Sequence, residues 1–195
     1  MLQKIADTML GKQEYDLVIQ NVQIVNVYND TIRKGEIGIV EGKIGEISYN
    51  TNHLKGKKTI DGNNKYAIPG FIDSHMHLES SMLTPNHFAE IALSCGTTTV
   101  AADPHEIANV MGIKGVKSLV EACLDLPLNV YVFAPSTIPS LPGFESSGFD
   151  VTGKEMNEML NLKGVIGLGE VMDFNAVSHG EKRMIDIIQA ATDKG

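Results

Sequence analysis

Hydrophobic and polar positions follow two different patterns along the chain, and the first pattern covers residues 1–66. Ile5 and Met9 precede Gly11 at a spacing that indicates a short amphipathic helix closed by glycine. Short runs rich in β-branched residues follow, separated by polar turn residues. These runs predict strands at 16–19, 22–27, 35–40 and 43–47. We expect residues 1–66 to form a helix and part of a small β-sandwich.

From residue 67 onward, apolar strands alternate with helix-like segments. The predicted strands are 67–73, 97–102, 129–134 and 164–169, and the predicted helices are 86–94, 112–124, 152–160 and 181–193. This alternation is typical of right-handed βαβ units around a parallel sheet. Four units fit either a small doubly wound sheet or half of an eight-stranded barrel.

Two observations favour the barrel. No G-x-G-x-x-G follows any strand, which disfavours a dinucleotide-binding sheet. The chain also stops after a helix, where a fifth strand would be due. We therefore expect an α/β fold in which residues 67–195 form an incomplete (β/α)8 barrel of about four β/α units, preceded by the β-sandwich portion at residues 1–66.

Charge and composition narrow the possible partners. The chain has 16 Lys and Arg against 24 Asp and Glu, a formal net charge of −8, which disfavours binding to nucleic acid or anionic membranes. Its apolar runs are shorter than the roughly 18 residues that span a bilayer, and its first residues lack the apolar run of a signal peptide. Cys95 and Cys123 form no C-x-x-C pair, which disfavours a disulfide framework or a cysteine-based zinc site. We expect a cytoplasmic protein.

Charged side chains gather where the predicted strands of the second region end. Parallel α/β proteins bind ligands beyond the carboxyl ends of their strands. The four ends carry 73–79, 103–106, 135–137 and 169–173. Three of them supply carboxylates and two supply histidines. Such groups repel or desolvate one another unless something compensates, and a divalent cation would do so.

His75 and His77 have a direct geometric reason to share a metal ion. Side chains at i and i+2 of an extended strand point to the same face, so both imidazoles can reach one ion at about 2.0–2.2 Å. The H-x-H motif alone is weak, because six histidines in 195 residues produce it often by chance. Its place after an apolar strand and the Pro69-Gly70 turn, with acids nearby, favours a metal site over two satisfied or exposed histidines.

The other candidates leave alternatives open. Glu170 follows a glycine-rich strand and could bridge two metals, or it could be a helix N-cap or a solvated carboxylate. Asp103, His105 and Glu106 suit general acid–base catalysis, but Asp103 could also cap a helix that starts at Pro104. Glu79 could face a substrate or form a polar loop rim. No G-x-S-x-G motif indicates a serine nucleophile, and the cytidine-type zinc deaminase signature is absent.

Longer motifs point to a known family. The β-rich first region followed by Pro69–His77 resembles the metal-dependent amidohydrolase superfamily, whose core is a (β/α)8 barrel. Three further segments resemble the adenine deaminase family within it, and the resemblance extends over essentially the whole chain. These segments are 77–81, 96–110 and 167–174.

The resemblance implies hydrolysis of adenine to hypoxanthine and ammonia, with water as the second substrate. It implies a centre of two Mn²⁺ ions, with Fe²⁺ or Zn²⁺ as alternatives. Two such cations lower the pKa of a bridging water, and the resulting hydroxide attacks C6 of the purine before ammonia leaves. The residues carried over are His75 and His77 on the first metal, Glu170 bridging both, and Asp103, His105 and Glu106 as catalytic groups that lie around the purine or shuttle protons. We also expect Glu79 and Ser136 to bind the substrate.

Members of this family are much longer than 195 residues, and their remaining metal ligands come from later strands. We therefore expect this chain alone to be inactive, its first metal to be incompletely enclosed, and the full-length protein to be a homo-oligomer. Another cyclic amide or amidine hydrolase, of the imidazolonepropionase or dihydroorotase type, is an alternative. A lysine in place of Glu170 would favour the dihydroorotase type. A non-catalytic scaffold is a further alternative, which loss of His75 and His77 would have indicated.

Overall fold

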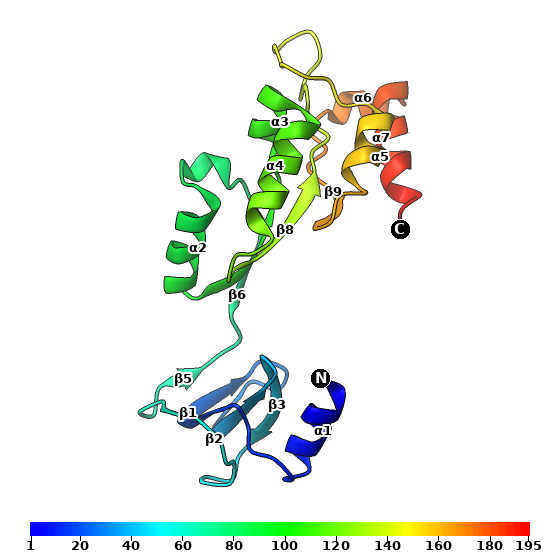
Figure 1. The fold of residues 1–195 in the computed structure, drawn as a ribbon. Helices are drawn as coiled ribbons and strands as arrows, with labels where there is room; N and C mark the ends of the chain where they lie inside the picture. The colour runs from blue at the N-terminus through cyan, green and yellow to red at the C-terminus, as the bar shows by residue number, and fades with distance from the viewer. The chain divides into compact units, whose positions relative to one another are not determined.

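The computed structural model describes all 195 residues, which form two compact units, Met1–Pro69 and Gly70–Gly195 (Figure 1). No helix in it combines the length and the apolar character that crossing a membrane requires.

The first unit is a single sheet with one helix. The strand order is β3-β2-β1-β4, and β5 also pairs with β1. β1 to β3 are antiparallel neighbours, whereas β4 and β5 run parallel to β1. A small core of Tyr15, Val18 and Val40 packs against Ile5 and Leu54. The elements are α1 (Leu2–Met9), β1 (Leu17–Asn26), β2 (Thr31–Val40), β3 (Lys43–Ser48), β4 (Thr59–Asp61) and β5 (Tyr66–Ala67).

The prediction of two strands at 16–19 and 22–27 is wrong, because the structure has one continuous strand, β1. The polar pair between them is not a turn. The register of β1 against β2 shifts between Ile19 and Val22, and Asn21 takes a left-handed φ of 56°. A bulge therefore absorbs these residues and the chain keeps its direction.

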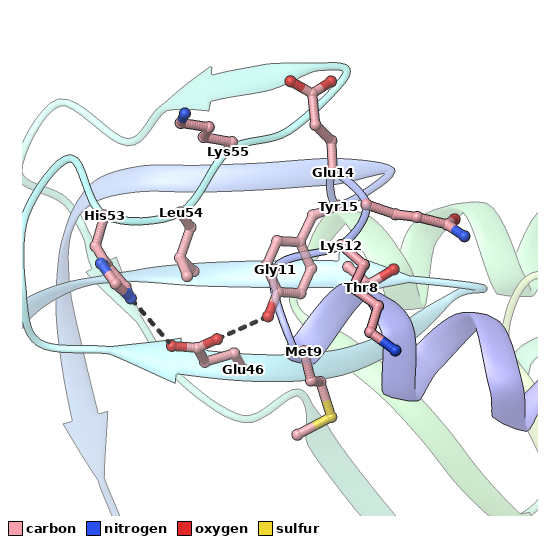
Figure 2. A pocket seen from close by; sticks show the side chains of 11 residues that line it. Thr8, Met9, Gly11, Lys12, Glu14, Tyr15, Glu46, His53, Leu54 and Lys55 are labelled. Carbon is pink, nitrogen blue, oxygen red and sulfur yellow. Dashed lines mark hydrogen bonds and ion pairs between the residues drawn. The ribbon is translucent and has the colours of Figure 1, made fainter.

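A hollow of about 450 Å³ lies in the first unit (Figure 2). The Tyr15 hydroxyl donates to Oε2 of Glu46 at 2.7 Å, and Nε2 of His53 lies 3.9 Å from Oε1 of the same carboxylate. Burial, together with the Glu46 carboxylate, raises the pKa of Tyr15 to about 12. The hydroxyl therefore stays a hydrogen-bond donor at neutral pH and ties the segment after α1 to β3.

The second unit contains a four-stranded parallel sheet with the order β6-β7-β8-β9. Strands that neighbour each other in chain order are typical of a (β/α)8 barrel, whereas a doubly wound sheet reverses its order at a switch point. The expected partial barrel is confirmed. Its elements are β6 (Phe71–Met76), η1 (Glu79–Ser81), α2 (Pro85–Ser94), β7 (Thr97–Ala102), α3 (His105–Met111), α4 (Ile113–Cys123), β8 (Asn129–Ala134), α5 (Gly153–Met159), β9 (Val165–Leu168), α6 (Phe174–Ser178) and α7 (Lys182–Thr192).

Helices flank this sheet and bury its apolar side chains. α2, α4 and α7 contact β7, β8 and β9 respectively, and α5 packs against α7. The largest buried cluster joins β8 to α4, α5 and α7, and its fully buried side chains include Val116, Val132, Met156, Met184 and Ile187. The helices bury the apolar side chains of the strands, and polar groups lie at the carboxyl ends of the strands.

The strand predicted at 67–73 is wrong in its position. β6 begins at Phe71 instead, after Pro69, which has no N–H to donate, and Gly70, whose Cα packs against Thr98. A Cβ on Gly70 would lie 2.2 Å from Oγ1 of Thr98. As a result His75 lies within β6, and His77 lies just beyond its end.

α3 and α6 are not among the helices predicted from the alternation, although a helix starting at Pro104 was left open as the alternative role of Asp103. α3 is separated from α4 only by Gly112, which takes a φ of +60° and a ψ of −146°. The ring of Phe149 lies over this glycine, where a Cβ would come within 2.5 Å of Cδ2. The break between the two helices therefore lies at a glycine, and a residue from a distant loop leaves no room for a side chain there.

Candidate metal centre

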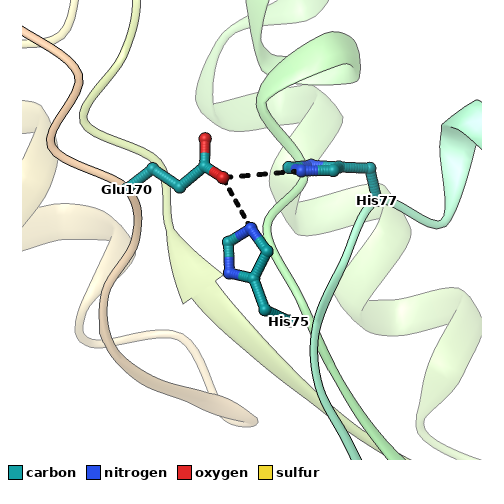
Figure 3. A group of neighbouring side chains, drawn as sticks. All are labelled: His75, His77 and Glu170. Atoms are coloured by element: carbon teal, nitrogen blue, oxygen red, sulfur yellow. Dashed lines mark ion pairs between the residues drawn. The ribbon is translucent and has the colours of Figure 1, made fainter.

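His75, His77 and Glu170 converge at the carboxyl end of the parallel sheet (Figure 3). Nε2 of His75 lies 2.6 Å from Oε1 of Glu170, and Nε2 of His77 lies 3.7 Å from the same oxygen. Their ligand atoms all lie within 4.8 Å of one another. The two imidazoles come from β6 and the residue after its end, and the carboxylate comes from just after β9. The edge strands of the four-stranded sheet thus supply one cluster.

A backbone carbonyl orients the ring of His77. Its Nδ1 lies 2.8 Å from the carbonyl oxygen of Asp103. A carbonyl can only accept, so Nδ1 carries a hydrogen and Nε2 is the ring nitrogen that faces Glu170 and could bind an ion. Burial opposes protonation of His77, but the Asp103 carbonyl and the Glu106 and Glu170 carboxylates outweigh it and raise the pKa. The same negative field favours a bound cation.

Asp103 is fully buried below this cluster. Its Oδ2 accepts the backbone N–H of Glu170 at 2.7 Å, and its Oδ1 lies 3.6 Å from Nδ1 of His105. Burial raises the pKa of the Asp103 carboxyl group. The alternative in which Asp103 caps a helix does not occur, because α3 begins at His105 and Pro104 holds the N-cap position without a side-chain cap.

His105 and Glu106 lie beside the first cluster. Nδ1 of His105 is 3.9 Å from Oε2 of Glu170, and Oε2 of Glu106 is 3.9 Å from Nε2 of His105 and 3.7 Å from Nδ1 of His77. Ser80, which was not predicted as a site residue, donates to Oε1 of Glu106 at 2.5 Å. Its position in a polar Ser-Ser pair after Glu79 is the only signal that the sequence offers.

Several of these buried polar atoms have no hydrogen-bond partner. They include Oδ1 of Asp103, Nδ1 of His105 and Oε2 of Glu106. A buried polar atom without a partner is costly, and a bound ion is one of the few ways to satisfy it. Two further groups have ligand atoms that all lie within 4.8 Å of one another. One consists of His77, His105 and Glu106, and the other consists of Asp103, His105 and Glu170. Imidazole nitrogens and carboxylate oxygens fit a divalent Mn, Fe or Zn ion.

The two residues expected at the substrate have different surroundings. Glu79 is partly buried, and its Oε1 accepts the N–H of Ile107 at 3.1 Å. Its Oε2 has no partner, and burial raises the pKa of the carboxyl group. Ser136 is only 1% exposed, and its hydroxyl donates to the backbone carbonyl of Glu170. The hydroxyl of Ser136 is therefore engaged with Glu170 and not with the open edge of the sheet.

Known proteins resemble the chain in sequence and in fold. It is 39% identical to adenine deaminase of Ruegeria sp. (strain TM1040), over 98% of this chain and 32% of that protein. The crystal structure of an adenine deaminase has a TM-score of 0.63 at 21% identity, covering 91% of this chain and 47% of that one. An N-acyl-D-glutamate deacylase from Bordetella bronchiseptica, complexed with zinc and a phosphonate inhibitor, has a TM-score of 0.59 at 16% identity, covering 93% and 44%.

These similarities show the family of the chain, but they cover only part of the length of the related proteins. The chain spans about a third of the length of the curated relatives that it matches. The solved structures, all of low identity, show the shared fold alone. The model of the Amidohydrolase family matches residues 66–195, which is the parallel-sheet unit together with the last residues of the first unit. The chain belongs to the amidohydrolase family.

Proposed function

We propose that this chain carries part of the active site of an enzyme that hydrolyses adenine to hypoxanthine and ammonia. The observation that carries the proposal is the convergence of His75, His77 and Glu170 at the carboxyl end of the parallel sheet. The identity to adenine deaminases over nearly the whole chain supports adenine as the substrate. Glu170, in place of a lysine, argues against the dihydroorotase type.

His75, His77 and Glu170 would hold the first metal ion. Asp103 and His105, which the resemblance placed among the catalytic groups, would instead hold a second ion together with Glu170. The two oxygens of Glu170 support this division, because Oε1 faces His75 and His77 while Oε2 lies 3.9 Å from His105. Bound divalent ions would supply a Lewis acid and a water of lowered pKa. Manganese is our first candidate, with iron and zinc as alternatives.

Glu106 is the residue that we assign to proton transfer. Its Oε1 is held by Ser80, while its Oε2 has no partner and lies near both His77 and His105. A carboxylate fixed at one oxygen and free at the other can take a proton and return it to a ring nitrogen without moving. Oε2 of Glu79, also without a partner, would accept a hydrogen bond from the purine.

The decisive experiment measures ammonia release from adenine by the full-length protein, with and without a chelator. We expect activity that the chelator removes and that Mn²⁺ restores. The double variant H75A/H77A should lose metal and activity together. H179A, at the exposed C-cap of α6, is the matched histidine control and should retain both. Full activity in the double variant would overturn the site assignment.

The same assay separates the alternatives. Hydrolysis of a cyclic amide without ammonia release from adenine would favour an imidazolonepropionase-like enzyme, and no hydrolysis of either would favour a scaffold. The expectation that the 195-residue chain alone releases no ammonia stays a prediction, which this assay tests. The homo-oligomeric state and the cytoplasmic location also stay predictions.

A further inference from the structure

Two buried side chains hold the backbone of Glu170 from opposite sides. Asp103, which follows β7, accepts the N–H of Glu170 at 2.7 Å. Ser136, which follows β8, donates its hydroxyl hydrogen to the carbonyl oxygen of Glu170. Both side chains are almost completely buried, with exposed fractions of 0% for Asp103 and 1% for Ser136. The peptide groups on both sides of the Glu170 Cα are therefore fixed by neighbouring strand ends.

Gly169 makes the close approach of Asp103 possible. A Cβ at Gly169 would lie 2.2 Å from Oδ2 of Asp103 and 2.9 Å from its Cγ. Any side chain here would push Asp103 away from the N–H of Glu170. Gly167, two residues earlier in β9, has nothing within 4 Å of the same position. Asp103 therefore sets the tightest limit on a side chain at 169, and the carbonyl oxygen of Ala134 in β8, at 3.2 Å, adds to it.

We propose that Ser136 is a positioning residue, which acts with Asp103 to hold Glu170 in place for metal binding. The Glu170 side chain has three rotatable torsions, so its carboxylate reaches His75 reproducibly only if its Cα is fixed. A clamp on both peptide groups supplies that fixed point. The proposal rests on the proposed function, because Glu170 must be a metal ligand for its position to affect metal binding. It replaces the expected contact of Ser136 with the substrate.

The test titrates the full-length protein, stripped of its metal, with Co²⁺ and follows the visible absorption of the bound ion. S136A should weaken Co²⁺ binding about 10–100-fold, as loss of an outer hydrogen bond to a ligand does, and should alter the spectrum. S136T keeps the hydroxyl and should restore both affinity and spectrum. S140A is the matched control, because Ser140 donates to the carbonyl of Thr137 in the same loop, outside the cluster. Circular dichroism verifies that each variant is folded.

A second pair of variants tests the clamp from its other side. G169A should weaken Co²⁺ binding because the new methyl group displaces Asp103, while G167A should bind as the wild type does. Wild-type affinity in S136A and G169A would overturn the clamp and leave the proposed function standing. Binding by S136T as weak as by S136A would also overturn the role of the hydroxyl. A full-length wild-type protein that binds no Co²⁺ would overturn the metal assignment, and the role of Ser136 with it.

Discussion

Oδ1 of Asp103 lies 3.6 Å from Nδ1 of His105, and neither buried atom has a hydrogen-bond partner. Leaving buried polar atoms unsatisfied costs about 1–3 kcal/mol each, so something must compensate. A cation held by these two atoms and by Glu170 would satisfy both at once. In the proposed centre, Asp103 and His105 would therefore belong to a second ion site, distinct from the one at His75 and His77.

Replacing Asp103 by Asn tests this separation. The amide oxygen of Asn can still accept the N–H of Glu170, so the first ion site should survive. The second site loses its buried negative charge, and we expect the full-length D103N protein to keep a single Mn²⁺ where the wild type keeps both. Elemental analysis after gel filtration measures the content, with D125N, at an exposed position, as the control. Retention of both ions in D103N would contradict the second site.

Glu106 should affect the reaction rate more than metal binding. E106Q keeps the contact with Ser80 but removes the group that takes up a proton, so we expect kcat for adenine to fall about 10²–10⁴-fold. KM and metal content should change little. Steady-state kinetics and elemental analysis of the full-length protein provide both measurements, with E90Q on the exposed side of α2 as the control. Loss of a metal ion in E106Q would instead make Glu106 a ligand.

The sequence predicted β7 and β8 residue for residue, because β-branched and aromatic runs with clear boundaries form strands in most surroundings. It failed where the local signal is ambiguous. A Gln-Asn pair suits a turn as well as a bulge, and only pairing with β2 decides that Asn21 lies in a bulge. Likewise, the crowding that excludes a side chain at Gly112, between α3 and α4, comes from Phe149, which is far away in the sequence.

The candidate site, like the fold, was predicted only in part. The rule that ligands bind at the carboxyl ends of parallel strands was enough to bring His77, Asp103 and Glu170 to one edge. It could not show that Asp103 turns inward to the N–H of Glu170, because that depends on how β7, β8 and β9 pack. The inward position of Ser136 was hidden for the same reason, and a substrate contact was predicted instead.

Asp16 should make the stability of the first unit depend on acid. The backbone N–H of Glu41 and the ammonium groups of Lys57 and Lys4 hold the pKa of Asp16 well below its usual range. A lowered folded-state pKa stabilises the fold above the unfolded-state value of about 3.9, and this stabilisation is lost as the pH falls toward the folded-state value. D16N should therefore be less stable than the wild type at pH 7, with the difference shrinking below about pH 4.

Urea unfolding followed by tyrosine fluorescence measures this effect. The chain has no Trp, and four of its five tyrosines, all except Tyr131, lie in the first unit, so the signal reports mainly on that unit. The stability of D16N is compared with that of the wild type at pH 7 and at pH 2. D30N, at an exposed position, is the matched control, and its stability should equal that of the wild type at both pH values. An equal loss of stability in D16N at pH 7 and at pH 2 would show that the charge of Asp16 is not the cause.

Gly112 should tolerate no side chain, for two separable reasons. Its backbone conformation, with φ +60° and ψ −146°, is close to a region that only glycine adopts readily and that costs other residues about 1–3 kcal/mol. A new methyl group would also lie against the Phe149 ring, adding about 1–3 kcal/mol of overpacking. G143A is the control for a positive φ without crowding, because Gly143 has a φ of +83° and open space around it. We expect thermal unfolding to show a larger loss for G112A than for G143A, and F149A to reduce the additional loss caused by G112A. Equal losses in G112A and G143A would mean that Phe149 does not crowd a side chain at Gly112.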